Sequence, residues 1–403
     1  HAQPRKDSLV LAMTLEPPGL DPTAGAASAI GEVTLYNVFE TLTKVNGDST
    51  ISPLLAQSWT VTPDNKTWAF KLKPGVKFHN GEPFNARTVK FAYERAAADG
   101  SVNKDKAVFA NIVNIAMTDD LTVVLTLKNP NPDFLFQLGQ ATAIITEPKS
   151  AAGNNTQPVG TGPFKLENWA KGSAIVLARW DEHRDAKAIK LRRVTMRFIS
   201  DAAAQVAAML AGDVDVFPRI AAAKSLPQFK SDKRFQVLIG GSRAKTVLAM
   251  NNKKKPLDDV RVRRAIAMAI DRKQVVEGAA DGFGAPIGSF YVPGAPGYVD
   301  LTGVNAYSPD KARALLKEAG IDKLELSMKL PPTPYARQGG EVVAAMLAKV
   351  GITAKQENVE WAQWLSGVYG QKAYDLTIIS HVEPLDFGNF ARPGYYWNYD
   401  SAE

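Results

Sequence analysis

The order of predicted elements near the carboxyl end constrains the fold of this 403-residue chain more than any other feature. Residues 324–330 (LELSMKL) and 374–379 (YDLTII) are typical of strands, and residues 341–351 (EVVAAMLAKVG) between them are typical of a helix. A strand–helix–strand order forms a parallel pair with a crossover helix. The sequence therefore predicts an α/β domain. Residue 380 onward should lie at the carboxyl end of a strand, where open α/β sheets bind ligands.

Helix caps and short apolar runs predict further elements along the rest of the chain. A Ser, Asp or Asn side chain before a helix accepts a hydrogen bond from its first turn. Such positions predict helices that begin after Asn85, Asp201, Asp258 or Asp259, and Ser308. Apolar runs predict a strand within 9–22, a hairpin at 58–72, and strands at 122–127, 163–169, 173–179, 213–217 and 245–251. The length allows two or three domains, each with its own core.

The composition is that of a globular protein and excludes several kinds of site. Hydrophobic residues make up 45% of the chain, and no apolar run approaches the roughly 18 residues that span a bilayer. The absence of cysteine excludes disulfides, thiolate metal ligands and cysteine nucleophiles. The net charge of +7 is modest, and the basic clusters 253–255 and 261–264 are typical of solvated faces. No nucleic-acid partner is expected.

The motifs of the common enzyme classes are missing. The chain contains no G-x-S-x-G elbow, no phosphate-binding P-loop, no H-E-x-x-H and no dinucleotide fingerprint. Its four histidines, His1, His79, His183 and His381, are too far apart in sequence for a paired metal motif. Glu383 beside His381 is the only local hint of metal binding. We therefore expect no catalytic residue, no metal ligand and no cofactor.

The acidic stretch 380–396 (SHVEPLDFGNFARPGYY) places Glu383 and Asp386 three residues apart among aromatic residues. The two carboxylates could be the acid and base of a hydrolase, metal ligands together with His381, or a clamp for a cationic ligand. Glycosidases place two carboxylates on either side of the scissile bond, and a three-residue spacing in a loop has no such geometry. Asp386 is expected to cap the turn 386–389 through Asx hydrogen bonds. Glu383 has no comparable structural explanation.

Five segments together resemble one family, in order and nearly from end to end. They are 74–95 (PGVKFHNGEPFNARTVKFAYER), 158–169 (PVGTGPFKLENW), 206–217 (VAAMLAGDVDVF), 251–272 (NNKKKPLDDVRVRRAIAMAIDR) and 383–390 (EPLDFGNF). The chain resembles the extracellular solute-binding proteins of bacterial ABC importers, in the oligopeptide, dipeptide and nickel class known as family 5. The resemblance implies an α/β, two-lobed periplasmic binding protein fold of type II, with a hinge and an extra subdomain.

The resemblance also implies a division of the chain and a cellular location. Residues 1–36 with 157–248 would form the core of lobe one, 37–156 its extra subdomain, and 249–403 lobe two. Family members usually continue beyond the position of Glu403, so lobe two is expected to lack its carboxyl-terminal part. The opening HAQP is compatible with an exported protein after removal of its signal peptide. A periplasmic location is expected.

The resemblance implies that Glu383 pairs with the α-ammonium of a bound peptide. Family peptide binders more often carry Asp there, and the longer Glu leaves a non-peptide ligand open: an opine, a sugar conjugate, a metal chelate or haem. Trp361 would be a pocket aromatic, or else a core residue. Tyr335 and Arg337, in a Pro-rich loop predicted at 331–340, would meet a ligand carboxylate.

The remaining candidates lie at both ends of the chain. In lobe one, the small residues of 23–29 would let a peptide ligand pair with the backbone like an added strand. The ligand-binding candidates there are Ala26, Ala27 and Ser28, and those near the carboxyl end are His381, Asp386 and Trp397. The expected partners are a peptide or small-molecule ligand and the permease subunits of an ABC transporter. The protein itself is expected to be a monomer without catalytic activity.

Overall fold

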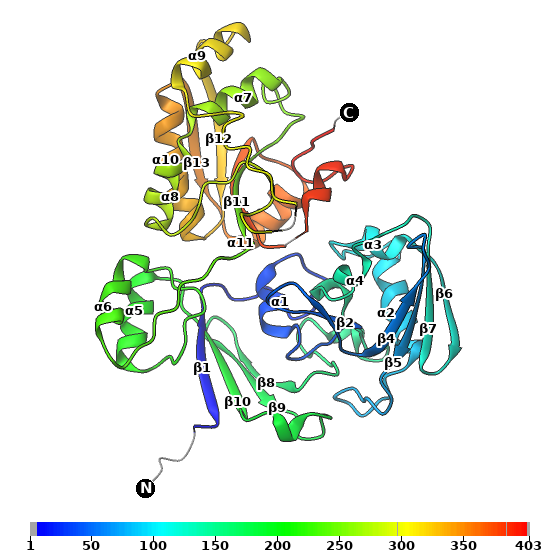
Figure 1. Cartoon of the computed structure of the whole chain (residues 1–403). Helices are drawn as coiled ribbons and strands as arrows, with labels where there is room; N and C mark the ends of the chain where they lie inside the picture. The colour runs from blue at the N-terminus through cyan, green and yellow to red at the C-terminus, as the bar shows by residue number, and fades with distance from the viewer. Residues whose placement is uncertain (1–5, 296, 384, 401–403) are drawn as a thin grey trace. The chain divides into compact units, whose positions relative to one another are not determined.

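The computed structural model describes residues 6–295, 297–383 and 385–400. The chain forms two compact units, His1–Ala221 and Ala222–Glu403 (Figure 1). The three-part division 1–36 with 157–248, 37–156 and 249–403 stays a prediction. Among the described residues, no helix is both long and apolar enough to cross a membrane.

The first sheet of the unit His1–Ala221 joins the start of the chain to a segment more than 150 residues later. Its strands, in spatial order, are β1 (Ser8–Met13), β10 (Arg193–Phe198), β9 (Ala174–Arg179) and β8 (Phe164–Ala170). β1 and β10 are parallel, and the other pairs are antiparallel. The predicted strand in 9–22 and the predicted hairpin around Gly172 are confirmed, and Gly172 adopts the positive φ of +74° that a tight turn favours.

The predicted strand at 213–217 is wrong. In this stretch the described residues form one isolated bridge, between Val216 and Leu11 of β1. The cause is Asp215, whose side chain accepts the backbone N–H of Val10 at 2.8 Å and so replaces the main-chain acceptor of a regular ladder. The preceding helix, α5 (Ala202–Ala211), is as predicted, capped by Asp201 and ended by Gly212.

A second, antiparallel sheet in this unit has the order β4 (Ala56–Val61), β5 (Thr67–Leu72), β7 (Thr122–Leu127), β6 (Ile112–Asp119). The predicted hairpin 58–72, the strand 122–127 and the Asn85 cap of α2 (Ala86–Ala97) are confirmed. Buried residues of α2 and of the sheet share one core that includes Val89, Tyr93 and Phe70. Shorter elements complete the unit: α1 (Ser28–Thr34), β2 (Thr43–Val45), β3 (Ile51–Pro53), α3 (Lys106–Ala110) and α4 (Phe134–Gln137).

The Gly160–Gly162 turn packs directly on the main chain of 37–39. A Cβ on Gly160 would stand 2.0 Å from the carbonyl oxygen of Val38, so only glycine fits. His79 bridges the turn: its Nε2 donates to the carbonyl of Gly162 at 2.8 Å, and its Nδ1 accepts the N–H of Gly160 at 3.3 Å. Both ring nitrogens are therefore used by the neutral imidazole. Burial lowers the pKa of His79 to about 4.

His79 should make this unit sensitive to acid. A histidine with a normal pKa of 6.5 when unfolded and about 4 when folded contributes stability that is complete above pH 6.5 and lost as the pH falls towards 4. This contribution of His79 to the free energy of unfolding is up to about 3 kcal/mol. We expect the difference in unfolding free energy between the wild type and His79→Gln, measured by urea denaturation, to shrink by that order between pH 7 and pH 4. A constant difference would contradict this assignment.

The unit Ala222–Glu403 is built on the predicted parallel pair. Its sheet has the order β11 (Lys245–Met250), β14 (Leu376–His381), β12 (Leu324–Leu330), β13 (Ile352–Asn358). β12 is parallel to both β14 and β13, and β11 is antiparallel to β14. The strands 324–330 and 374–379 are confirmed, but β13 is an additional strand. The crossover helix α10 leads from β12 to β13.

The crossover helix is longer than predicted. α10 (Pro334–Ala348) begins at Pro334, so the segment 331–340 is largely helical and not a loop. Proline fits the first turn of a helix, where its missing N–H is not needed. A Gly-Gly pair such as Gly339–Gly340 is typical of a loop. In this helix both glycines are buried, because the helix lies close to the sheet. A Cβ on Gly340 would come within 2.5 Å of Leu330.

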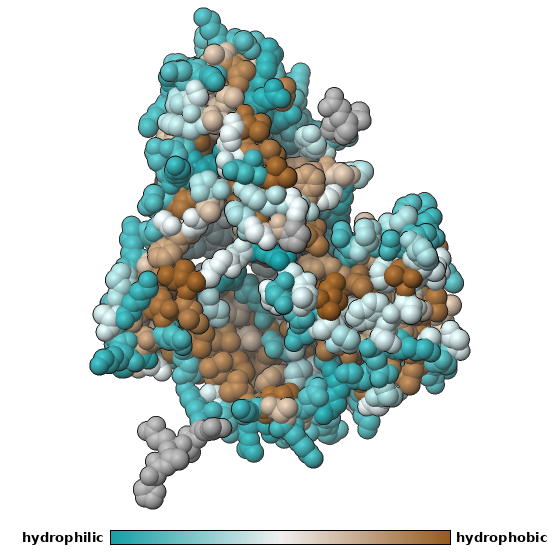
Figure 2. Space-filling view, viewed as in Figure 1, coloured by the Kyte–Doolittle hydropathy of each residue, from teal (hydrophilic) through white to brown (hydrophobic). Residues whose placement is uncertain are grey.

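Further helices in the described part of this unit include α6 (Leu226–Ser231), α7 (Val260–Ala269), α8 (Arg272–Ala280) and α9 (Pro309–Glu318). The predicted caps Asp259 of α7 and Ser308 of α9 are confirmed. Both helices bury an apolar face, and Figure 2 shows hydrophilic residues over the end of the unit where α9 lies. A separate buried cluster joins the aromatic residues Phe290, Trp364, Tyr396 and Trp397 to Ala249 of β11 and Ile379 of β14, and is called the aromatic cluster below.

Candidate functional site

A buried lysine organises the acidic stretch at the end of β14. Lys245, the first residue of β11, pairs in register with His381, the last residue of β14, and is 1% exposed. Its Nζ donates to the carbonyl oxygen of Glu383 at 2.5 Å and lies 2.8 Å from Oδ1 of Asp386. Lys245 is absent from the site residues that the sequence predicts. The only local signal is a charged residue at the start of an apolar strand, and its partners depend on the register of that strand.

Asp386 does not cap the turn that follows it, so that prediction is wrong. The turn is closed by the carbonyl oxygen of Asp386, which accepts the N–H of Asn389 at 3.0 Å. The carboxylate faces Lys245 instead, because a buried ammonium binds a carboxylate more strongly than a neutral amide does. Burial raises the pKa of Asp386 to about 6, the contacts with Lys245 oppose the rise, and the charge of Glu383 adds to it.

The structure brings three of the predicted residues together. Ligand atoms of His381, Glu383 and Asp386 all lie within 4.8 Å of one another. Imidazole and carboxylates are donors that suit zinc or nickel. Here, however, the Asp386 carboxylate is already engaged by the ammonium of Lys245, 2.8 Å away. The expectation that no metal binds stays a prediction.

Two of the predicted residues are buried in the aromatic cluster. The His381 ring stacks on Tyr396, and its Nε2 is 2.8 Å from the Tyr396 hydroxyl. Trp397 stacks on Phe390 with 4.5 Å between ring centroids. His381 and Trp397 are both buried, whereas Glu383 is half-buried. Glu383 is therefore the more accessible of these three side chains.

The other candidates of this unit lie around α10 and the segment after β13. Tyr335 is on α10, and its hydroxyl accepts the N–H of Ser380 in β14 at 3.2 Å. Arg337, also on α10, lies 3.5 Å from Glu360, so its carboxylate partner belongs to the chain itself. Trp361 opens the short helix α11 (Trp361–Gln363) and is half-buried on the ring of Trp364, 5.4 Å away.

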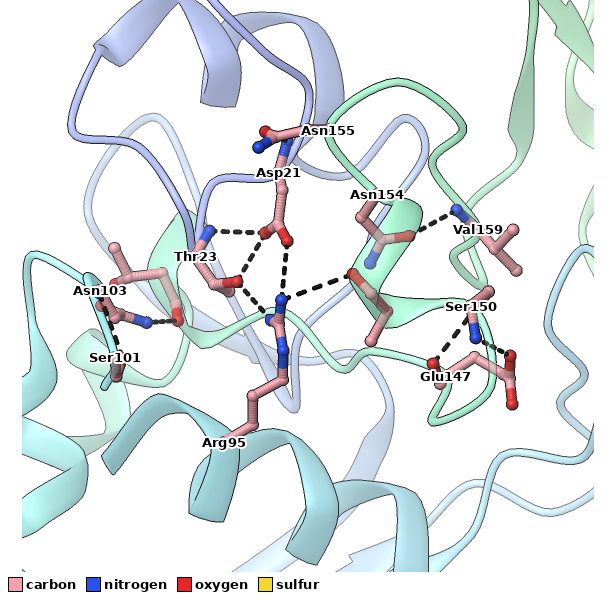
Figure 3. A network of polar contacts seen from close by, with 12 residues as sticks. Asp21, Thr23, Arg95, Ser101, Asn103, Glu147, Ser150, Asn154, Asn155 and Val159 are labelled. Atoms are coloured by element: carbon pink, nitrogen blue, oxygen red, sulfur yellow. Dashed lines mark hydrogen bonds and ion pairs between the residues drawn. The ribbon is translucent and has the colours of Figure 1, made fainter. Parts of the chain in front are cut away.

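The candidates Ala26, Ala27 and Ser28 belong to the other unit, His1–Ala221. Ala27 precedes α1, and Ser28 is its first residue. The chain just before them is fixed by a buried network (Figure 3). There Asp21 accepts the N–H and hydroxyl of Thr23, at 2.8 and 2.6 Å, and pairs with Arg95 of α2 at 3.2 Å. The sequence does not reveal Arg95 as a support for this segment, because the ion pair joins residues 74 positions apart.

A cavity of about 680 Å³ also lies in the unit Ala222–Glu403, at the start of α8. Its walls include Asp271, Arg272, Tyr298, Asp300 and Tyr307, and none of the predicted site residues lines it. The Asp271 side chain accepts the first free N–H groups of α8, so these amides are not available to an anion.

Comparison with known proteins decides the family. The description "Bacterial extracellular solute-binding proteins, family 5 Middle" matches residues 50–397. The chain belongs to this family. Its family 5 relatives include the dipeptide-binding protein of Escherichia coli, which is 30% identical over 393 residues, 89% of this chain and 73% of that protein. A putative ABC transporter peptide-binding protein of Brucella ovis is also 30% identical, and the matched region spans 62% of its length.

Solved structures confirm the α/β fold with two lobes. The binding protein AgaA of A. tumefaciens, in complex with agropinic acid, is 27% identical with a TM-score of 0.89, over 98% of this chain and 83% of that one. DppA of Helicobacter pylori, in complex with the peptide STSA, is 25% identical with a TM-score of 0.86, over 94% of this chain and 80% of that one. The predicted membership of family 5 is likewise confirmed.

Proposed function

We propose that this chain is the periplasmic solute-binding component of an ABC importer. It captures a peptide, or a similarly sized solute that carries an amine, between its two lobes and delivers it to the permease subunits as a monomer. Membership of family 5 supports the receptor role. The names of two relatives support the peptide: the E. coli dipeptide-binding protein and the H. pylori protein with bound STSA.

The observation that carries the amine preference is the half-buried Glu383 at the carboxyl end of β14. Its carboxylate lies close to Asp386 and His381, and one lysine, Lys245, faces the group. Two carboxylates against one ammonium leave a net negative charge when His381 is neutral. A ligand ammonium would balance it through a charge-assisted hydrogen bond in a partly desolvated place.

An opine or a similar non-peptide solute is the second candidate. AgaA, whose structure holds agropinic acid, has a TM-score of 0.89 and is slightly more similar in sequence than the peptide-bound H. pylori protein. Glu383 reaches further than the Asp more often found in family peptide binders. The receptor role is the same for both candidates, and only the ligand differs.

The protein releases its ligand unchanged in this proposal. A hydrolase that used Glu383 and Asp386 would need both carboxylates to reach the scissile bond. Asp386 is buried against Lys245, 2.8 Å away, and therefore occupied by a structural contact. Mass spectrometry of a bound peptide after prolonged incubation should show it intact. Cleavage products formed in proportion to the protein would contradict this part.

A thermal-shift panel tests the ligand class. A ligand that binds only the folded state raises stability by RT ln(1 + [L]/Kd), about 2.7 kcal/mol at a hundredfold excess over Kd. We expect di- to pentapeptides with free amino termini to raise the melting temperature, and their N-acetylated forms to raise it much less. If opines shift the melting temperature and peptides do not, the second candidate replaces the first. If no small solute shifts it, the receptor proposal fails.

A further inference from the structure

We propose that Lys245 is the positioning residue of the acidic stretch. Its buried ammonium fixes the main chain at Glu383 and thereby sets the direction of the Glu383 carboxylate. The consequence for ligand affinity rests on the proposed function, whereas the fixing of the main chain does not.

The contacts of the Lys245 ammonium define its role. A lysine has three N–H donors. Its Nζ lies 2.5 Å from the carbonyl oxygen of Glu383, 2.8 Å from Oδ1 of Asp386 and 3.3 Å from the carbonyl oxygen of Arg243. The two carbonyl oxygens accept hydrogen bonds and Asp386 forms an ion pair, so these contacts of the ammonium all lie within the chain itself. Lys245 acts on a ligand through Glu383 and not by direct contact.

Packing alone does not explain a lysine at this position. Burying an ammonium costs several kcal/mol, and well-packed apolar residues can replace a buried ion pair without loss of stability. An apolar side chain, however, could not hold a carbonyl oxygen 138 residues further along the chain. The lysine therefore contributes fixed geometry at Glu383 in addition to packing.

Aromatic contacts restrain the same stretch at its far end. The Lys245 ammonium lies 5.1 Å from the centre of the Phe290 ring, which in turn contacts the Phe390 ring at 5.1 Å. The neighbouring Tyr291 stacks on Phe387. The stretch is thus held at Glu383 and Asp386 by the ammonium, and at 387–390 by rings. Of these restraints, the ammonium is the one that contacts the main chain at Glu383.

The test compares variants by amide hydrogen exchange in the ligand-free full chain. Lys245→Met combined with Asp386→Leu removes the ammonium without leaving an unpaired buried charge, so the protein should fold. We expect amides in 382–391 to exchange at least tenfold faster than in the wild type, with α10 unchanged. Lys329→Met is the matched control, because Lys329 is a half-buried lysine that also donates to a carbonyl, that of Ala373, in a bond at the surface. Lys329→Met should leave the amide exchange rates of 382–391 unchanged.

A second variant separates the main-chain contact from the ion pair. Asp386→Asn keeps the donor to the Glu383 carbonyl and should retain protection of 382–391 to within threefold. If this variant loosens the stretch as much as the double variant does, the ion pair positions it and the proposal fails. Unchanged exchange in the double variant also overturns the proposal. Should the double variant not fold, Lys245→Met combined with Asp386→Asn takes its place, because this pair of changes also leaves no buried charge without its counter-charge.

Ligand affinity then links the positioning role to function. With trialanine as the probe, measured by calorimetry, the double variant should bind at least tenfold more weakly than the wild type. Affinity equal to the wild type, in a variant whose stretch exchanges faster, would overturn the link between positioning and binding. If Glu383→Gln leaves trialanine affinity unchanged while the double variant still loosens the stretch, the proposed amine clamp fails and the positioning of the main chain stands.

Discussion

Glu383→Gln should weaken the binding of an amine-bearing ligand by about 30-fold to a few thousand-fold. Truncating one partner of a buried, hydrogen-bonded charge pair typically costs about 2–5 kcal/mol. Glutamine keeps the size of the side chain and removes its charge. The measurement is isothermal calorimetry with the peptide that gives the largest thermal shift, and with its N-acetylated form. In the wild type, acetylation of the peptide should weaken binding about as much as the mutation does. In Glu383→Gln, acetylation should weaken binding only slightly further.

Glu325→Gln is the control for this experiment. Glu325 is on β12, its side chain is 61% exposed, and its ion pair with Lys355 is at the surface. The same chemical change there should leave Kd within the error of the measurement. If Glu383→Gln binds the best peptide within threefold of the wild type, the carboxylate does not face the ligand ammonium. The non-peptide candidate would then be favoured.

The second large effect, on the free energy of unfolding, is expected from a substitution at Glu40, in the unit His1–Ala221. Glu40 is 3% exposed and pairs bidentately with Arg184, at 2.6 and 2.9 Å. It also accepts the hydroxyl of the buried Thr161 at 2.8 Å. This cluster ties the chain after α1 to the Gly160–Gly162 turn and to the segment after β9. A bidentate buried pair with an additional hydrogen bond is costly to break from one side.

Glu40→Gln should lower the unfolding free energy by about 3 kcal/mol, because Arg184 would lose its buried counter-charge and keep only the exposed Asp185, 3.6 Å away. For a unit of this size the melting temperature of the unit should fall by roughly 10 °C. Glu325→Gln again serves as the control and should shift melting by no more than about 1–2 °C. Differential scanning calorimetry resolves the two outcomes. A shift for Glu40→Gln no larger than that of the control would contradict a stabilising role for the cluster.

Local signals account for most of the fold that the sequence predicts. Helices with a clear cap, such as those after Asn85 and Ser308, are confirmed because the cap and the apolar face agree with each other. Strands without an apolar pattern are missed: β6 and β13 carry mostly exposed residues, and neighbouring strands supply the pairing that keeps them extended. At 213–217 the pattern fits a strand, but the Asp215 side chain takes the acceptor role.

The candidate site shows the same division between local and long-range information. The position of Glu383 at a strand end follows from the order of elements nearby. The role of Asp386 does not, because its partner Lys245 lies on a strand far away in sequence, and only the register of β11 against β14 brings them together. The same holds for Arg95, which pairs with Asp21 in the segment that leads to Ala26–Ser28 and is far from it in sequence (Figure 3). Contacts between distant elements are what a single sequence leaves undetermined.

The most direct test is native mass spectrometry of the purified protein, followed by denaturation and identification of what is released. We expect a solute with a free amine, such as a short peptide, bound at one molecule per chain and lost on denaturation. The same preparation of Glu383→Gln should carry much less of it. A released solute without an amine, bound equally by the wild type and Glu383→Gln, would contradict the proposed amine clamp at Glu383.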